Sequence, residues 1–199
     1  MKGIIYWHPQ IYAFFVRLMF KKDYLARYTI IAELIPEGSS VVDVCCGDCK
    51  LYEFLKEKNI DYLGLDFNAH FVAAARRRGI RAETFDARND AIPPSEIIVI
   101  QSSLYQFMPS HQEIMKKLFD AAKRYLIISE TIKSYGRSPS RVISFLAKRI
   151  TDPGDGMKPY RFTLEELKKS LAPYRENMAK EYCWQGREYV VMIGKSVKT

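Results

Sequence analysis

Three acidic residues recur at regular intervals in the first half of the chain. Asp43 lies within a valine-rich run, Asp66 ends the apolar run 62–65, and Asp86 follows residues 81–85. The spacing between successive acids is about the length of one strand, one helix and two short turns. Because the carboxyl ends of parallel strands meet at one edge of a sheet, we expect the three carboxylates at the same edge. An acid at the end of the second strand is well placed to accept both hydroxyls of a ribose.

The turn after the first acid is built from small residues. Residues 41–49 are Val-Val-Asp-Val-Cys-Cys-Gly-Asp-Cys, which predicts a buried strand, a tight turn and a helix over residues 50–58. A helix N-terminus offers unpaired N–H groups, and small side chains let a ligand approach the backbone. The turn is therefore a candidate ligand site.

Composition limits the class of protein. The chain has 199 residues, of which 48% are apolar, enough for one α/β domain and short for two. The net charge of +8 favours anionic partners in general. Polar residues interrupt the apolar N-terminus too soon for a signal sequence or a membrane span, so we expect a cytoplasmic protein with reduced thiols.

The remaining pattern predicts alternating strands and helices. Residues 10–34 have the spacing of one or two amphipathic helices, and Asn68, Ser110 and the pair Thr163 and Glu166 are expected to cap later helices. Further strands are predicted at 60–65, 97–100, 125–129, 177–184 and 189–193, and further helices at 69–78, 111–124 and 164–171. Glycine in the last connection, residues 185–188, indicates a closing hairpin.

Residues 41–107 resemble the cofactor half of a class I S-adenosylmethionine-dependent methyltransferase. Residues 43–49 are similar to the first motif of that family, with cysteine at Cys45 and Cys49, where glycine is usual, and with the turn glycine Gly47 in place. The resemblance implies an α/β fold: a Rossmann-like three-layer sandwich with a mostly parallel seven-stranded sheet that ends in a C-terminal antiparallel hairpin.

The resemblance also implies S-adenosylmethionine as the cofactor. Asp66 would bind the ribose, Phe67 would lie on the adenine, and Asp86 and the next backbone N–H would bind the adenine edge. The residues expected to line the cofactor are Asp43, Cys45, Gly47, Asp66, Phe67, Asp86, Ala87 and Gln101. Residues 101–107 resemble the fourth motif of small-molecule methyltransferases more than that of nucleic-acid amino-group methylases, so nucleic acid is a less expected acceptor.

We expect a single methyltransferase-like domain, 1–199, in which residues 1–34 form a helical cover and residues 132–162 form an insertion near the substrate side. Methyl transfer is an in-line displacement that needs mainly positioning, so no catalytic residue is singled out. A base is needed only for a nucleophile that carries a proton, and His8, Tyr105, Glu130 and Tyr135 are candidates by position. The expected acceptor is a small-molecule or lipid-like, amphiphilic anionic substrate; the oligomeric state is not predicted.

Three alternatives remain open. Cys46 and Cys49 form a Cys-x-x-Cys between a strand and a helix, where a helix N-terminus lowers a thiol pKa in redox proteins. No second Cys or His pair stands at zinc-ligand spacing, so no metal is expected. A nicotinamide dinucleotide enzyme is disfavoured because Gly47 is the only glycine in the turn. A cofactor-binding module without catalytic activity would have the same pattern.

Overall fold

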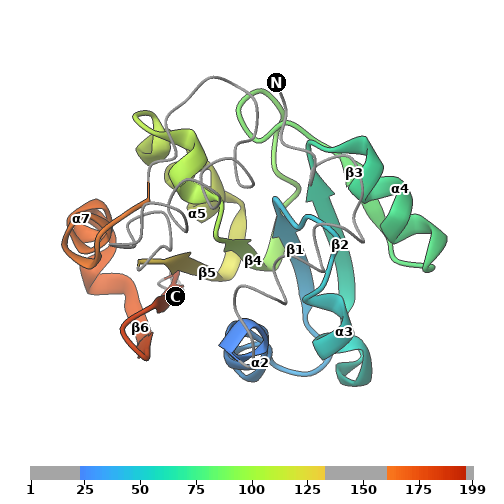
Figure 1. Ribbon diagram of the computed structural model, residues 1–199, viewed down its shortest axis with the longest axis horizontal. Helices are drawn as coiled ribbons and strands as arrows, with labels where there is room; N and C mark the ends of the chain where they lie inside the picture. The colour runs from blue at the N-terminus through green and yellow to red at the C-terminus, as the bar shows by residue number, and fades with distance from the viewer. Residues whose placement is uncertain (1–22, 133–160, 196–199) are drawn as a thin grey trace, which may run out of the picture.

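A seven-stranded sheet runs through the computed structural model, which describes residues 23–132 and 161–195 (Figure 1). The strand order is β3-β2-β1-β4-β5-β7-β6. Strands β1 to β5 pair in parallel, β7 is antiparallel to β5, and β6 is antiparallel to β7. The bounds are β1 (Ser40–Val44), β2 (Asp61–Asp66), β3 (Ala82–Thr84), β4 (Ser95–Gln101), β5 (Ala122–Thr131), β6 (Met178–Trp184) and β7 (Glu188–Gly194). The predicted fold class is confirmed, including the closing hairpin.

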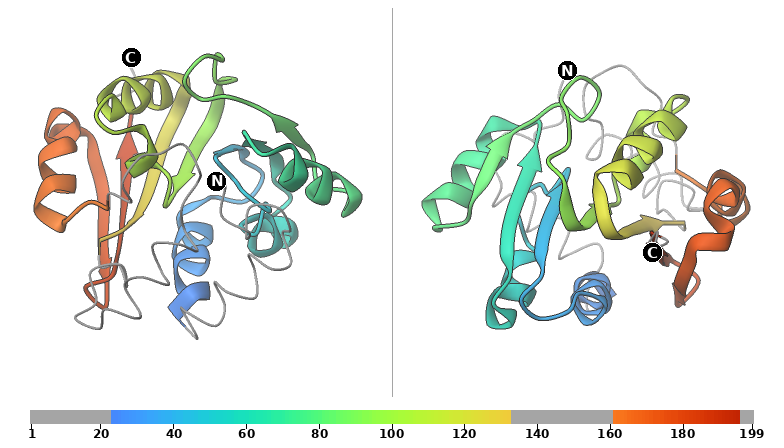
Figure 2. Two further views of the ribbon diagram at one scale, coloured as in Figure 1. Left: turned by 45° about the horizontal axis from the view of Figure 1, so that its top comes forward. Right: turned by 180° about the vertical axis from the view of Figure 1, so that it is seen from behind.

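Helices cover both faces of the sheet and form the outer layers (Figures 1 and 2). Side chains from α5 and α7 pack on one face, and side chains from α2, α3 and α4 pack on the other. The bounds are α2 (Asp23–Leu34), α3 (Tyr52–Leu55), α4 (Ala69–Arg77), α5 (His111–Ala121) and α7 (Leu164–Ser170), with short 3-10 turns η2 (Lys56–Lys58), η3 (Leu104–Phe107) and η5 (Ala172–Asn177).

Strand β4 shows why the apolar runs of this sequence form central strands. Ile98 and Ile100 face the layer of α5, Ile97 and Val99 face the layer of α2, and all four are fully buried. A parallel strand covered on both faces needs apolar side chains at every position, and β-branched residues fit that environment. This strand therefore places Gln101, its last residue, at the carboxyl edge of the sheet.

Two of the three predicted caps are present, and two predicted helix ends are wrong. Ser110 precedes α5 but makes no side-chain capping hydrogen bond. Asn68 accepts a hydrogen bond from the N–H of His70 at 2.9 Å, and Thr163 and Glu166 form a capping box. The helix predicted over 50–58 is split into α3 and η2, and the helix predicted over 111–124 ends at Ala121. Pairing of Ala122 with Ser95 on β4 draws the residues after Ala121 into β5, so tertiary pairing overrides a locally helical pattern.

The two covers predicted at 1–34 and 132–162 are described only in part. Residues 1–22 and 133–160, which include His8 and Tyr135, lie outside the described residues. In the described part, Tyr28 of α2 stacks on Phe54 with ring centroids 5.5 Å apart. Within residues 23–132 and 161–195, no helix has the length and apolar character needed to cross a membrane.

Candidate functional site

Four acidic or amide side chains lie near the carboxyl edge of the sheet. Asp43 is in β1, Asp66 and Gln101 end β2 and β4, and Glu130 is the penultimate residue of β5. Their strands are neighbours, with Asp43 opposite Gly64 on β2 and Val99 on β4. These side chains therefore lie at one edge of the sheet, as expected. Glu130 lies there in addition to the acids that were predicted from their spacing.

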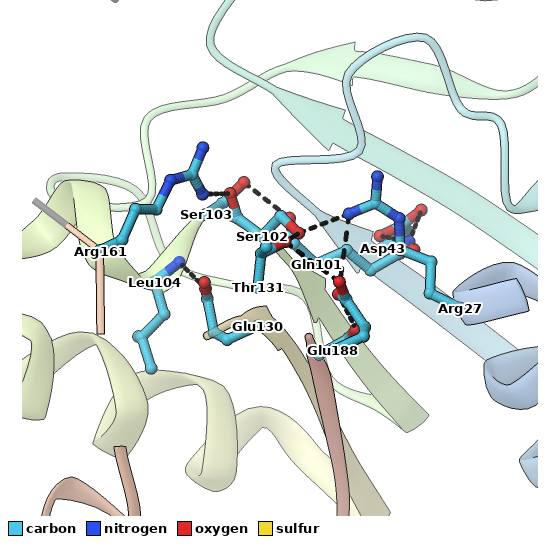
Figure 3. Close-up of polar contacts among 11 residues, drawn as sticks. Arg27, Asp43, Gln101, Ser102, Ser103, Leu104, Glu130, Thr131, Arg161 and Glu188 are labelled. Carbon is cyan, nitrogen blue, oxygen red and sulfur yellow. Dashed lines mark hydrogen bonds and ion pairs between the residues drawn. The ribbon is translucent and has the colours of Figure 1, made fainter. Parts of the chain in front are cut away.

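Asp43 is a fully buried carboxyl group. It accepts a hydrogen bond from the hydroxyl of Tyr62 at 2.9 Å, and the amide nitrogen of Gln101 lies 3.3 and 3.4 Å from its two oxygens (Figure 3). Burial raises the pKa of Asp43 from 3.8 to about 7, although both hydrogen bonds act in the opposite direction. The amide oxygen of Gln101 is buried without a partner among the described residues, so this corner has an acceptor atom to offer to a ligand.

Asp66 fixes the turn that follows β1. Its two oxygens accept hydrogen bonds from the backbone N–H groups of Gly47 at 2.7 Å and Asn68 at 2.8 Å. Each carboxylate oxygen has two lone-pair directions, so both oxygens retain capacity for a further donor. The carboxylate thus joins the turn after β1 to the start of α4 and still faces the edge of the sheet.

The cysteines at the glycine positions of the first motif have left-handed backbones. Cys45 has φ 59° and Cys49 has φ 54°, close to φ 57° at Gly47. This region costs roughly 1–2 kcal/mol for a residue with a Cβ. The chain therefore keeps the turn geometry that the resemblance implies, with residues that adopt it at a cost in stability.

We expect Cys45→Gly to be more stable than Cys45→Ala by about 1 kcal/mol, because both remove the thiol and only alanine retains the left-handed strain. Urea unfolding of the two variants measures the difference. The matched control is Ala73→Gly in α4, where glycine should destabilise by about 1 kcal/mol. Equal stability of the two Cys45 variants would show that the left-handed backbone at this position is not strained.

The thiols of Cys46 and Cys49 lie against β2. Their sulfur atoms are 3.3 Å apart, and a Cβ added to Gly64 would come within 2.6 Å of the Cys49 sulfur and 2.9 Å of the Cys46 sulfur. Glycine at position 64 is therefore what makes room for the pair. The hydrogen bond with Cys49 and burial raise the pKa of the Cys46 thiol well above its usual value, the reverse of the low pKa that the redox alternative requires.

The residues expected around an adenine lie along the same edge. Phe67 is 69% exposed, so its side chain is not part of the hydrophobic core. The oxygens of Asp86 accept from the N–H of Arg88 and the side-chain amide of Asn89 within its own turn, and Ala87 is buried. These contacts hold Asp86 and its turn beside the end of β3.

A second polar cluster, which the sequence did not predict, lies at the ends of β4 and β5, beside α2 (Figure 3). Ser102 accepts a hydrogen bond from Arg27 at 2.5 Å and lies 3.2 Å from the Thr131 hydroxyl. Glu188 accepts from Thr131 at 3.1 Å and pairs with Arg27 at 3.7 Å. Since Arg27 and Ser102 are 75 positions apart, no local pattern joins them.

Arg161 and Glu130 lie on the other side of Ser102 (Figure 3). The guanidinium of Arg161 stacks on the ring of Tyr105, 3.6 Å from its centroid, and donates to the carbonyl of Ser102 at 3.5 Å. One oxygen of Glu130 accepts from the N–H of Leu104 at 2.6 Å. The two arginines thus approach the turn after β4 from opposite sides.

The thiol of Cys45 shows that these groups converge. Burial raises its pKa, the charges of Asp66, Asp43 and Glu130 raise it further, and Arg88 lowers it. The thiol of Cys45 therefore lies within electrostatic range of charged side chains from β1, β2, β5 and the turn after β3. Within the described ranges, no group of three or more His, Cys, Asp or Glu side chains is arranged to hold a metal ion.

Comparison with known proteins points to one family. Residues 25–129 match the family model described as methionine biosynthesis protein MetW. The trans-aconitate 2-methyltransferase of Mycobacterium ulcerans (strain Agy99) is 28% identical over 149 residues, which are 72% of this chain and 54% of that protein. The chain therefore spans about half the length of the curated relatives it matches.

Solved structures share the fold at low identity. The magnesium protoporphyrin IX methyltransferase ChlM from Synechocystis PCC 6803 with bound SAH has a TM-score of 0.62 and 16% identity, covering 87% of this chain and 81% of that chain. The [4+2]-cyclase SpnF has a TM-score of 0.66 and 14% identity, covering 89% and 82%. Because one of these is described as a cyclase, the likeness supports the fold and leaves the chemistry to the site.

Proposed function

Since the chain belongs to the MetW family, and with it to the class I S-adenosylmethionine-dependent methyltransferases, we propose that it transfers a methyl group from S-adenosylmethionine to a small-molecule acceptor. The observation that carries this proposal is the corner formed by Asp43, Gly47, Asp66 and Gln101 at the carboxyl edge of the sheet. Open α/β sheets bind nucleotide-like ligands at this edge.

The residues present fit the proposed cofactor. Asp66 retains lone pairs for the ribose hydroxyls, and the exposed ring of Phe67 offers a face to the adenine. The amide oxygen of Gln101, which has no hydrogen-bond partner in ranges 23–132 and 161–195, and the buried acid Asp43 suit a ligand that carries an ammonium and a sulfonium charge. Cys45, Asp86 and Ala87 complete the proposed lining, and the left-handed backbone at Cys45 keeps the turn tight.

The chain contributes mainly by positioning. When bound, S-adenosylmethionine supplies an electrophilic methyl group on a sulfonium. Asp66 would hold the ribose, and Asp43 and Gln101 would hold the charged end. Holding two reactants at near-attack distance is worth about 7 kcal/mol or more. No covalent intermediate with the protein is required.

The acceptor that we propose is a small carboxylic acid. Three observations support it: the relatives named as trans-aconitate methyltransferases, the two arginines that flank Ser102, and the net charge of +8. A lipid-like, amphiphilic anion is the alternative acceptor. A protein with such an acceptor should bind anionic vesicles more strongly than neutral ones, and equal binding to both would exclude this alternative.

Two further features belong to the proposal. All four cysteines are free, and the close thiols of Cys46 and Cys49 suit a reducing compartment such as the cytoplasm. The sequence 1–199 forms one methyltransferase domain.

Calorimetric titration tests the function. The reduced protein is titrated with S-adenosylmethionine, S-adenosylhomocysteine and NAD, and transfer of labelled methyl to trans-aconitate is then measured. We expect micromolar binding of the first two ligands, none of NAD, and methyl transfer. Absence of binding would refute the cofactor assignment, and binding without transfer to any acid would favour a binding module.

A further inference from the structure

Glu130 is a buried acid with one open oxygen. Its side chain is fully buried, and while one oxygen accepts from the N–H of Leu104 at 2.6 Å, the other has no hydrogen-bond partner among the described residues. Buried polar atoms without partners are rare in folded proteins, and each one needs an explanation. Glu130 lies on the α5 side of β5, next to the turn after β4 where the proposed acceptor would approach.

The charged groups around Glu130 come from three other elements. Arg161, before α7, lowers its pKa, whereas Glu188 on β7 raises it, and the charge of Glu130 in turn raises the pKa of the Cys45 thiol in the turn after β1. The backbone N–H groups of Leu104 and Ser103 also favour the ionised form. Burial outweighs them and raises the pKa of Glu130 from 4.5 to about 7. Near neutral pH, the protonated acid is therefore readily available as a hydrogen-bond donor.

We propose that the open oxygen of Glu130 binds the methyl acceptor, donating the proton of its carboxyl group to a carboxylate oxygen of a small carboxylic acid beside the guanidinium of Arg161. This inference rests on the proposed function and names the residue that recognises the acceptor. The contact is non-covalent: one proton lies between two carboxyl groups, and the cation of Arg161 balances the remaining charge. It gives the orphaned oxygen the partner that the described residues do not supply.

A pH dependence follows from this contact. A bound carboxylate raises the pKa of Glu130 further, because two like charges at close range are unfavourable. Above pH 7 the free protein has lost the proton and must take it up again to bind. Affinity for the acid should therefore fall by up to about tenfold per pH unit above pH 7 and level off below it.

The test is titration of trans-aconitate into the protein saturated with S-adenosylhomocysteine, at pH 6, 7 and 8, in buffers of two different ionisation enthalpies. The carboxyl groups of this probe are already ionised at pH 7 and above, so proton uptake there reports on the protein. We expect uptake approaching one proton at pH 8 and about fivefold weaker binding than at pH 7, because about half of the free protein already lacks the proton at pH 7.

Variants assign the effect to Glu130. Glu130→Gln has an amide that donates without ionising, so it should bind at pH 6 within about threefold of the parent, with no pH dependence and no proton uptake. Glu130→Ala should bind roughly tenfold or more weakly at pH 6, because a charge-assisted hydrogen bond is lost. Glu57→Gln, an exposed acid in η2, should behave as the parent.

The outcomes separate this inference from the proposed function. Binding without proton uptake in the parent, or unchanged uptake in Glu130→Gln, would overturn the role of Glu130. Failure of trans-aconitate to bind at pH 6 to a protein that holds S-adenosylhomocysteine would also overturn it, while the cofactor assignment stands. Failure to bind S-adenosylhomocysteine would instead overturn the proposed function together with the inference.

Discussion

Replacing Asp66 by alanine is expected to weaken S-adenosylmethionine binding at least tenfold. Two charge-assisted hydrogen bonds to the ribose would be lost, and each such bond contributes about 1.5 kcal/mol or more. The turn would loosen as well, because Asp66 holds the N–H groups of Gly47 and Asn68. Calorimetric titration of the folded variant measures the first effect, and urea unfolding measures the second.

The control lies on the same strand. Asp61 begins β2 at the opposite edge of the sheet, and its exposed carboxylate pairs with Arg81. Asp61→Ala should leave cofactor affinity unchanged, since exposed ion pairs contribute little and this one is remote from the turn. If Asp66→Ala folds and binds as tightly as the parent, the carboxylate does not hold the ribose.

The fold was predictable because its signals are local. The isoleucine and valine runs that form β1 and β4 are buried on both faces, and that environment leaves a continuous β-branched pattern in the sequence. The caps at Asn68 and Thr163 act over two or three residues. The end of α5 was not predictable from local sequence. The residues after Ala121 have a helical pattern, and their pairing with β4 draws them into β5.

The candidate site was predictable only in part. Asp43, Asp66 and Asp86 could be found because their spacing matches one strand, one helix and two turns, and parallel topology brings the ends of strands together. Arg27, Ser102 and Glu188 could not be found, because their contacts join α2, the turn after β4 and β7 across long stretches of sequence. The raised pKa of the Cys46 thiol could not be predicted either, since the burial that raises it, between the turn after β1 and β2, exists only in the folded protein.

The buried acid Asp43 should make the protein less stable as the pH rises. Its pKa is about 7 in the folded protein and near 3.8 when exposed, so the unfolded chain ionises first. Below pH 3.8 the group is neutral in both states and has no effect. Between pH 3.8 and pH 7 the folded state loses about 1.4 kcal/mol per pH unit relative to the unfolded chain, and the loss is complete above pH 7.

Asp43→Asn removes this penalty. The asparagine oxygen still accepts from Tyr62, and its amide can donate to the oxygen of Gln101, which has no partner among the described residues. We expect the variant to gain about 2–3 kcal/mol over the parent between pH 5 and pH 8, as measured by urea unfolding at both values. A gain that is the same at both pH values would show that Asp43 is ionised in the fold throughout.

The same substitution should weaken S-adenosylmethionine binding, because a neutral amide no longer attracts the charged end of the cofactor. Opposite effects on stability and binding are expected from one cause, because the buried charge that lowers stability is also the charge that attracts the cofactor. Asp43 is held without a cation among its hydrogen-bond partners in the described residues, Tyr62 and Gln101. The cost of burying this acid is therefore best explained by a cationic ligand that offsets it only when bound.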